Sequence, residues 1–175
     1  MDEPEIIARL GGDPHNPDMD APLHQHETTI RVRYPEVDPQ GVVHHSHYLV
    51  YLEIGRTELF RALGESYKAL ETSGTLLVVA ETGIKYRRPA FYDDELTLVT
   101  RIDSIDRRGI CLRFSYDLKR EARLLATGTT TLAAVDRRGR LTSLPEALQA
   151  RIRRSGEAGG VQASATDTAL PVREE

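Results

Sequence analysis

Residues 32–58 read VRYPEVDPQGVVHHSHYLVYLEIGRTE, a polar strand that runs into an acidic loop and then into an apolar helix. Asp38 lies in the loop, Gly41 allows a sharp turn of the backbone, and the helix is predicted to begin near His45 or Ser46. This order places a carboxylate beside the unpaired N–H groups of a helix N-terminus, where negative charge on a ligand is stabilised. The stretch therefore predicts a site that polarises a carbonyl group and attacks it.

The residues around this stretch predict an α+β order of elements. Thr28–Tyr34 alternates, with Ile30, Val32 and Tyr34 on one face, which indicates a half-buried strand. The long helix is predicted over Ser46–Leu63 and is followed by strands with little between them, an order that is not doubly wound. The other predicted elements are a glycine stop at Gly64, a short helix at Glu65–Glu71, strands at Leu76–Tyr86, Glu95–Ile105, Ile110–Leu118 and Arg123–Val135, and a helix at Pro145–Arg153.

The long helix carries a wide apolar stripe and an internal glycine. Gly55 costs about 1 kcal/mol relative to alanine, which is tolerable where another backbone packs close. The stripe is formed by Leu49, Leu52, Leu59 and Leu63 and is widened by Tyr48, Tyr51 and Phe60.

The two ends of the chain differ in composition from its middle. Residues 1–27 have scattered Gly and Pro and no sustained period, which predicts a flexible N-terminal arm. Residues 155–175 have few large apolar side chains and cannot bury enough surface to offset the entropy of ordering, which predicts a disordered tail. Residues 28–154 are expected to form the folded domain.

Composition excludes several classes of protein. The formal charge of −4 over 175 residues argues against non-specific nucleic-acid binding, which needs a basic surface. Cys111 is the one cysteine, which excludes an intramolecular disulfide and agrees with a reducing cytoplasm. The first residues do not have the pattern of a secretory signal, and no run approaches the roughly 20 apolar residues of a membrane span. We therefore expect a soluble, cytoplasmic protein.

The segment Asp38–Tyr48 (DPQGVVHHSHY) resembles the signature of the hot-dog-fold acyl-CoA thioesterases of the 4-hydroxybenzoyl-CoA thioesterase family, including the Tol-Pal-associated branch. The resemblance extends over about Thr28–Arg153. It implies a hot-dog fold, in which an antiparallel sheet wraps around a long central helix. It also implies hydrolysis of an acyl-CoA thioester without a cofactor or metal, by a homodimer or homotetramer whose sites lie at the subunit interface.

The resemblance also assigns roles to individual residues. It makes Asp38 the catalytic carboxylate, as a nucleophile or as a general base, and the sequence leaves both roles open. It makes the backbone N–H of His45 the oxyanion donor, whereas the imidazole could instead bond the substrate or cap the helix. The residues expected to bind substrate are Gly41, Val43, Tyr48, Arg87 and Arg88. Arginine binds phosphate with two hydrogen bonds, so Arg87 and Arg88 suit the phosphates of coenzyme A; Arg107 and Arg108 in a predicted hairpin turn would suit them equally, and either pair is also typical of a solvated turn.

Other interpretations remain open at this stage. Asp38 before Pro39 is also an ordinary turn residue, and Glu53 is interpreted as a structural acid although another hot-dog branch uses a helix glutamate in catalysis. An acyl-carrier-protein thioesterase would keep this chemistry and need a basic docking surface, whereas a non-catalytic acyl-CoA-binding protein would keep only the fold. The histidines suggest a metal site, but they lack the usual spacing of zinc ligands; they are His24, His26, His44, His45 and His47.

Overall fold

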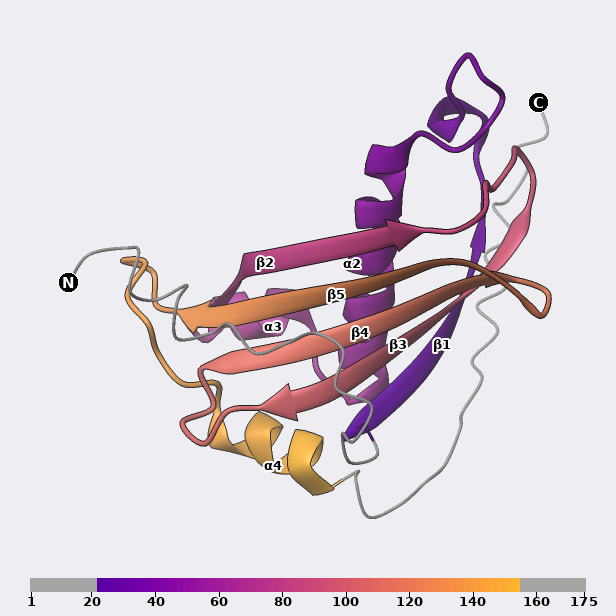
Figure 1. Ribbon diagram of the computed structural model, residues 1–175. Coiled ribbons are helices and arrows are strands. Elements are labelled where there is room, and N and C mark those ends of the chain that lie inside the picture. Colours follow the sequence, from indigo (N-terminus) through magenta and orange to yellow (C-terminus); the bar gives the residue numbers. More distant parts are fainter. Residues whose placement is uncertain (1–21, 155–175) are drawn as a thin grey trace, which may run out of the picture.

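The computed structural model describes residues 22–154 and confirms the α+β order (Figure 1). Most of the predicted arm and the whole predicted tail lie outside the described residues. The elements are β1 (His24–Arg31), a 3-10 helix η1 (Tyr34–Glu36), α2 (His45–Ala62), α3 (Tyr67–Thr72), β2 (Leu76–Tyr86), β3 (Glu95–Ile105), β4 (Cys111–Arg120), β5 (Arg123–Val135) and α4 (Glu146–Arg154).

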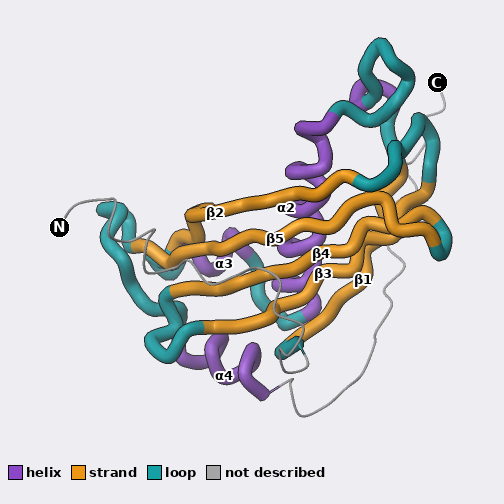
Figure 2. Tube along the Cα trace, viewed as in Figure 1, coloured by secondary structure: helices purple, strands orange, loops and turns teal. Residues whose placement is uncertain are grey.

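The five strands form one antiparallel sheet in the order β1-β3-β4-β5-β2, with β1 and β2 at its edges. The long helix α2 crosses one face of this sheet, as Figures 1 and 2 show. Its buried face meets apolar side chains of the inner strands, and this contact forms the core. The core includes Leu52, Leu59 and Phe60 from α2 and Leu98, Ile102, Leu112, Phe114, Leu118 and Leu132 from the sheet.

Gly55 lies where α2 packs against β3. A Cβ atom at this position would stand 2.3 Å from Oγ1 of Thr100 and 2.5 Å from Cδ2 of Leu98. The expectation that another backbone packs close to Gly55 was wrong, because the nearest atoms belong to side chains of β3. The absence of a side chain at Gly55 thus lets α2 pack closely against β3.

The prediction for the first strand was wrong at both ends. β1 begins at His24, inside the expected arm, where it pairs with Ile102 of β3, and it ends at Arg31. Ile30 and Val32 are buried as expected, but Tyr34 is 78% exposed. Pro35 follows it, and the Glu36 side chain accepts the backbone N–H of the residue before the turn, so the chain leaves the sheet and turns into η1.

The predicted apolar stripe of α2 was also wrong in one position. Leu49 is 44% exposed, as is its neighbour Val50 at 42%. Val78 and Val79 are likewise exposed on β2, the strand at the open edge of the sheet beyond β5. These side chains leave apolar surface on the helix and on the sheet edge. No helix within residues 22–154 is both long and apolar enough to cross a membrane.

Candidate active site

The loop between η1 and α2, residues 37–43, is a tight hairpin that we call the Asp38 loop. Val37 and Val43 pair across its base, and the N–H of Asp38 donates to the carbonyl of Val42 at 2.9 Å. The N–H of Gly41 donates back to the carbonyl of Asp38 at 2.9 Å, with Gly41 at φ +80°. A Cβ at Gly41 would meet nothing, so the turn needs glycine for its backbone angle and not for space. The expected sharp turn is confirmed.

The Asp38 carboxylate is half-buried and partly committed to this turn. Its Oδ1 accepts the backbone N–H of Gln40 at 2.8 Å, the bond expected of an aspartate in a turn. It forms no ion pair with any residue between 22 and 154, and Oδ2 has no hydrogen-bond donor there. The turn therefore orients the carboxylate through one oxygen and leaves the other available.

The N-terminus of α2 lies directly after this loop. His44 is the N-cap: its N–H donates to the carbonyl of Glu36 at 2.9 Å, and its ring Nδ1 bonds the Ser46 hydroxyl at 2.8 Å and faces the Ser46 N–H at 3.4 Å. His47 donates its N–H to the carbonyl of His44 at 3.0 Å. The N–H of His45, by contrast, finds no acceptor among the described residues. An unpaired donor at the positive end of a helix dipole attracts a partial negative charge.

Two tyrosines join the end of β2 to the start of α2. The Tyr86 hydroxyl donates to the carbonyl of His45 at 3.1 Å. The rings of Tyr48 and Tyr86 pack edge to face with centroids 5.0 Å apart, and the Tyr48 hydroxyl accepts a long bond of 3.4 Å from the N–H of Ala90. Val43 is buried, and its N–H donates to the carbonyl of Ala90 at 2.9 Å. The segment after β2 thus braces the first turn of the helix.

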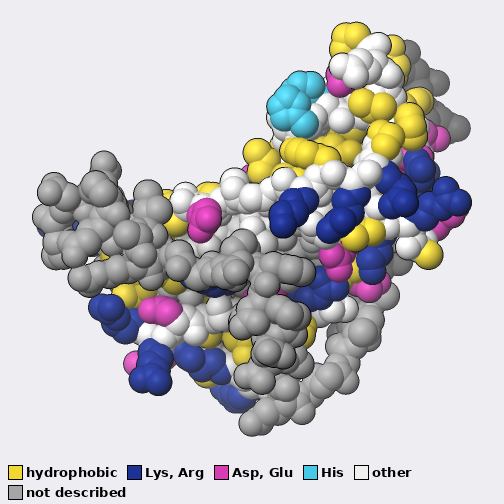
Figure 3. All heavy atoms as spheres, viewed as in Figure 1, with side chains coloured by type: hydrophobic (Ala, Val, Ile, Leu, Met, Phe, Trp, Pro, Cys, Tyr) yellow, Lys and Arg dark blue, Asp and Glu magenta, His cyan; other side chains and the backbone are white. Residues whose placement is uncertain are grey.

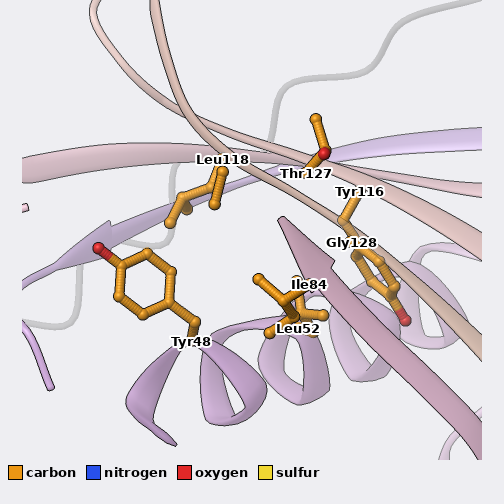
Figure 4. Close-up of a pocket in the computed structure, with 8 residues that line it drawn as sticks. Tyr48, Leu52, Ile84, Tyr116, Leu118, Thr127 and Gly128 are labelled. Atoms are coloured by element: carbon orange, nitrogen blue, oxygen red, sulfur yellow. The ribbon is translucent and has the colours of Figure 1, made fainter. Parts of the chain in front are cut away.

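A small apolar cavity lies behind Tyr48, between α2 and the sheet (Figure 4). The rings of Tyr48 and Tyr116 stand at its two ends, with Leu52 and Ile84 between them, and the Tyr116 hydroxyl points away from Tyr48. Its interior measures about 10 Å³, space for a water molecule and not for an acyl chain. Burial raises the pKa of Tyr48, so its hydroxyl stays neutral. The cavity is therefore part of the packing beneath the site.

Five cations lie at the end of the sheet where β2 ends, and they form what we call the basic rim. Lys85, Arg87 and Arg88 flank Tyr86 at the end of β2 and beyond it. The N–H groups of both arginines donate to Leu125 of β5, so the neighbouring β4–β5 turn brings two further cations to the rim, Lys119 and Arg123. None of the five forms an ion pair with a residue of the described chain. Figure 3 shows Lys and Arg side chains over this end of the sheet.

Comparison with known proteins assigns the chain to a family. Residues 32–152 match the family described as the thioesterase-like superfamily. The chain belongs to this superfamily. Over 109 residues it is 34% identical to YneP of Bacillus subtilis (strain 168), covering 62% of this chain and 78% of that one. It is also 34% identical over 108 residues to the acyl-CoA thioester hydrolase YbgC of Escherichia coli O6:H1, covering 61% and 79% of the two chains.

Solved structures agree with the assignment to the superfamily. The crystal structure of a probable thioesterase from Bartonella henselae superposes with a TM-score of 0.66 at 30% identity, covering 70% of this chain and 100% of that one. The DHNA-CoA thioesterase of Staphylococcus aureus shares the fold, with a TM-score of 0.71 at 22% identity, 79% coverage of this chain and 97% of that one. The expected hot-dog fold is confirmed, with a five-stranded antiparallel sheet and the long helix against it.

The candidate histidines fall into two groups: His24 and His26 lie in β1, and the rings of His44, His45 and His47 lie close together at the start of α2. Within residues 22–154, no three side chains of His, Cys, Asp or Glu are placed to hold a metal ion. His44, His45 and His47 surround the first turn of α2, whereas His26 lies in β1 near Glu58, in the last turns of the same helix. Figure 3 shows histidine side chains at the top of the molecule, above the body of the sheet.

Other expected site residues also have clear places. Glu53 lies on α2 with a side chain that is 67% exposed and forms a loose pair with Arg56 at 3.7 Å. The sequence analysis missed Glu36, which is only 2% exposed, and Tyr86, which contacts His45. A signal for Glu36 was present, because an acid three residues after Arg33 at a turn can accept the N–H of that residue. Nothing local could indicate Tyr86.

Proposed function

We propose that the protein hydrolyses an acyl-CoA thioester to the free acid and coenzyme A. Asp38 acts as nucleophile or general base, and the N–H of His45 is the oxyanion donor. The observation that carries this proposal is the N–H of His45 at the helix N-terminus, which has no acceptor within residues 22–154 and directly follows the loop that holds Asp38. Membership of the thioesterase-like superfamily and the name of the relative YbgC support the choice of reaction.

The chemistry follows from these two groups. The thioester carbonyl oxygen accepts the His45 N–H, and attack at the carbonyl carbon places negative charge on that oxygen, where the helix dipole stabilises it. Collapse of the resulting tetrahedral intermediate breaks the C–S bond and releases coenzyme A as a thiolate, which takes a proton from water. If Asp38 attacks, water then hydrolyses the mixed anhydride; if Asp38 acts as a base, it takes the proton of the attacking water.

The rest of the predicted binding set is proposed to hold the substrate around these atoms. Gly41 keeps the Asp38 loop tight, while Val43 and Tyr48 form the apolar support beneath the first turn of α2. Arg87 and Arg88 belong to the basic rim, whose charges suit the phosphate groups of coenzyme A. The rim is notable on a chain whose formal net charge is −4.

We also propose a homodimer or homotetramer. β2 presents an open edge over 11 residues, and natural proteins seldom leave such an edge uncovered. The exposed Val78 and Val79 on this strand and Leu49 and Val50 on α2 would be covered by a second copy. Light scattering with sedimentation velocity tests this proposal, and a monomer at micromolar concentration would contradict it.

A panel of acyl-CoA esters, with released thiol measured by a colorimetric reagent, tests the proposed function. We expect hydrolysis of at least one aromatic, short-chain or long-chain ester, and we expect it to persist after treatment with EDTA. Tight binding of an ester without thiol release would indicate an acyl-CoA-binding protein. Activity lost with EDTA and restored by zinc would contradict the metal-free mechanism and point to the histidines.

A second candidate function is hydrolysis of acyl groups held on an acyl carrier protein. The basic rim favours this candidate too, because an acidic partner needs a basic docking surface. The test compares kcat/KM for the same acyl group on coenzyme A and on the carrier protein. A much higher value for the carrier would make the carrier protein the substrate.

A further inference from the structure

Glu36 is a nearly inaccessible carboxylate just before the Asp38 loop. Its Oε2 accepts the N–H of Arg33 at 2.8 Å and the hydroxyl of Tyr51 at 2.7 Å. Its Oε1 accepts hydrogen bonds from Nε and Nη2 of Arg33 at 2.8 Å and 2.6 Å. The Glu36 side chain is 3% exposed, and Tyr51 is 1% exposed within α2. Each carboxylate oxygen therefore accepts two hydrogen bonds.

The backbone of Glu36 adds another connection. Its carbonyl accepts the N–H of His44, the N-cap of α2, at 2.9 Å. One residue thus binds the chain entering the loop at Arg33, the chain leaving it at His44, and the body of the helix at Tyr51. Asp38 lies between the first two attachment points, and His45 directly follows the second. These contacts therefore fix both ends of the loop that carries Asp38 relative to the N-terminus of α2.

The charge of Glu36 makes the contacts strong. Burial opposes ionisation, but the bonds from Arg33 and Tyr51 outweigh it and hold the pKa of Glu36 below its ordinary value. Burial, followed by the bond to Glu36, raises the pKa of Tyr51, so this hydroxyl remains a donor. Hydrogen bonds to a charged group are worth about 1.5–3 kcal/mol each, and removing one partner leaves a buried charge incompletely satisfied.

We infer that Glu36, with Arg33 and Tyr51, is a clamp that sets the position of the Asp38 carboxylate relative to the His45 N–H. Glu36 and Tyr51 are positioning residues: they act through the loop and do not contact the reacting atoms. The inference deepens the proposed function and rests on it. A clamp of this kind should affect turnover more than substrate affinity, because the reacting groups need their geometry most in the transition state.

The test compares Glu36→Gln and Tyr51→Phe with Tyr67→Phe. The Tyr67 hydroxyl is also buried but has no hydrogen bond of regular geometry within residues 22–154, so it is a matched control for losing a phenolic oxygen. We expect kcat to fall about a hundred-fold in Glu36→Gln and about ten-fold in Tyr51→Phe. KM should change less than two-fold, and Tyr67→Phe should keep wild-type kinetics. The double variant should be no worse than Glu36→Gln alone, because both changes break the same bond.

Hydrogen exchange gives a reading that does not depend on activity. The N–H groups of Asp38, Gly41 and His44 are hydrogen-bonded in the loop, and they should exchange faster in Glu36→Gln and Tyr51→Phe but not in Tyr67→Phe. If no acyl ester is hydrolysed by the wild-type protein, the proposed function fails while exchange still tests the clamp. Unchanged exchange and unchanged kcat in a folded Tyr51→Phe would overturn the inference, even if Glu36→Gln failed to fold.

Discussion

The N-terminal and C-terminal ends of α2 differ in how their backbone groups are satisfied. At the C-terminal end, Nη1 of Arg151 donates to the carbonyls of Leu63 and Gly64, both at 2.9 Å, and Nη2 pairs with Glu65 at 2.8 Å. At the N-terminal end, the N–H of His45 has no acceptor within residues 22–154. The same helix is thus capped by α4 at one end and left with an unpaired donor at the other.

This contrast predicts that stability and the proposed function depend on opposite ends of one helix. Protein groups complete the C-terminal end, so changes there should alter the free energy of unfolding and not the rate of catalysis. In the proposed function, the N-terminal end keeps a donor for the substrate and the Glu36 clamp positions Asp38, so changes there should alter the rate. The predictions below test that separation.

The largest effect is expected for Asp38→Asn. This change keeps the shape of the side chain and its bond to the Gln40 N–H but removes the charge that attacks or accepts a proton. We expect kcat to fall by a factor of about 10²–10⁴ with an unchanged melting temperature. Glu53→Gln is the matched control, a carboxylate on α2 that is exposed and loosely paired. If Glu53→Gln loses activity and Asp38→Asn does not, the assignment of the carboxylate is wrong.

His45→Pro removes the unpaired donor itself. His44 has φ −59° and ψ 136°, the conformation that a residue before proline prefers, and proline is tolerated at the first position of a helix. We expect kcat to fall about 10²–10³-fold, as for the loss of an oxyanion donor. His45→Ala keeps the N–H and should lose only a few-fold. A folded His45→Pro protein with full activity would mean that the carbonyl is held elsewhere.

Arg151→Met probes the C-terminal end of α2, where Arg151 bonds the backbone carbonyls. It removes the bonds to Leu63 and Gly64 and the pair with Glu65, so we expect a loss of about 2 kcal/mol in the free energy of unfolding measured with urea. The kcat value should not change. Arg154→Met is the control, because among residues 22–154 that side chain bonds only to the carbonyl of Ala150 in its own helix. A loss of kcat in Arg151→Met without a loss of stability would contradict the expectation that this end of α2 affects stability alone.

The smallest effect concerns pH and His26. Burial lowers the pKa of His26, even though Glu58 and Glu27 raise it, so the folded protein binds its proton less readily than the unfolded chain. The stability from a neutral His26 is complete above the unfolded pKa of about 6.5 and is lost as the pH falls below it. His26→Gln should therefore flatten the fall in unfolding free energy between about pH 7 and pH 5. An identical slope in both proteins would contradict this.

Local sequence patterns predicted some elements well. The period of α2 and the glycine after it placed the helix to within a residue, and β2, β3 and β5 have the predicted bounds. The alternation of β1 continued in the sequence to Tyr34, but the bonds of Glu36 end the strand earlier. Leu49 fits the helical period, yet period alone does not show which neighbours reach a side chain.

The geometry of the candidate site was predictable where its residues are close in sequence. Asp38, Gly41 and His45 lie in one short motif, and the turn and helix start follow from local chemistry. The role of Glu36 depends on Tyr51, which is 15 residues away, and the basic rim depends on strand pairing that joins Arg87 to the β4–β5 turn. Such long-range contacts leave no periodic signal in a single sequence.

The central claim is that the open N-terminus of α2 binds the thioester carbonyl, and backbone NMR tests it most directly. The probe is an acyl-CoA analogue in which a methylene replaces the thioester sulfur, so the carbonyl remains and cannot be hydrolysed. The account predicts that the amide of His45 shows a large downfield proton shift on binding, while the amides of Gly64 and Glu65 at the capped end stay in place. Saturable binding that leaves the His45 amide unmoved would contradict the account.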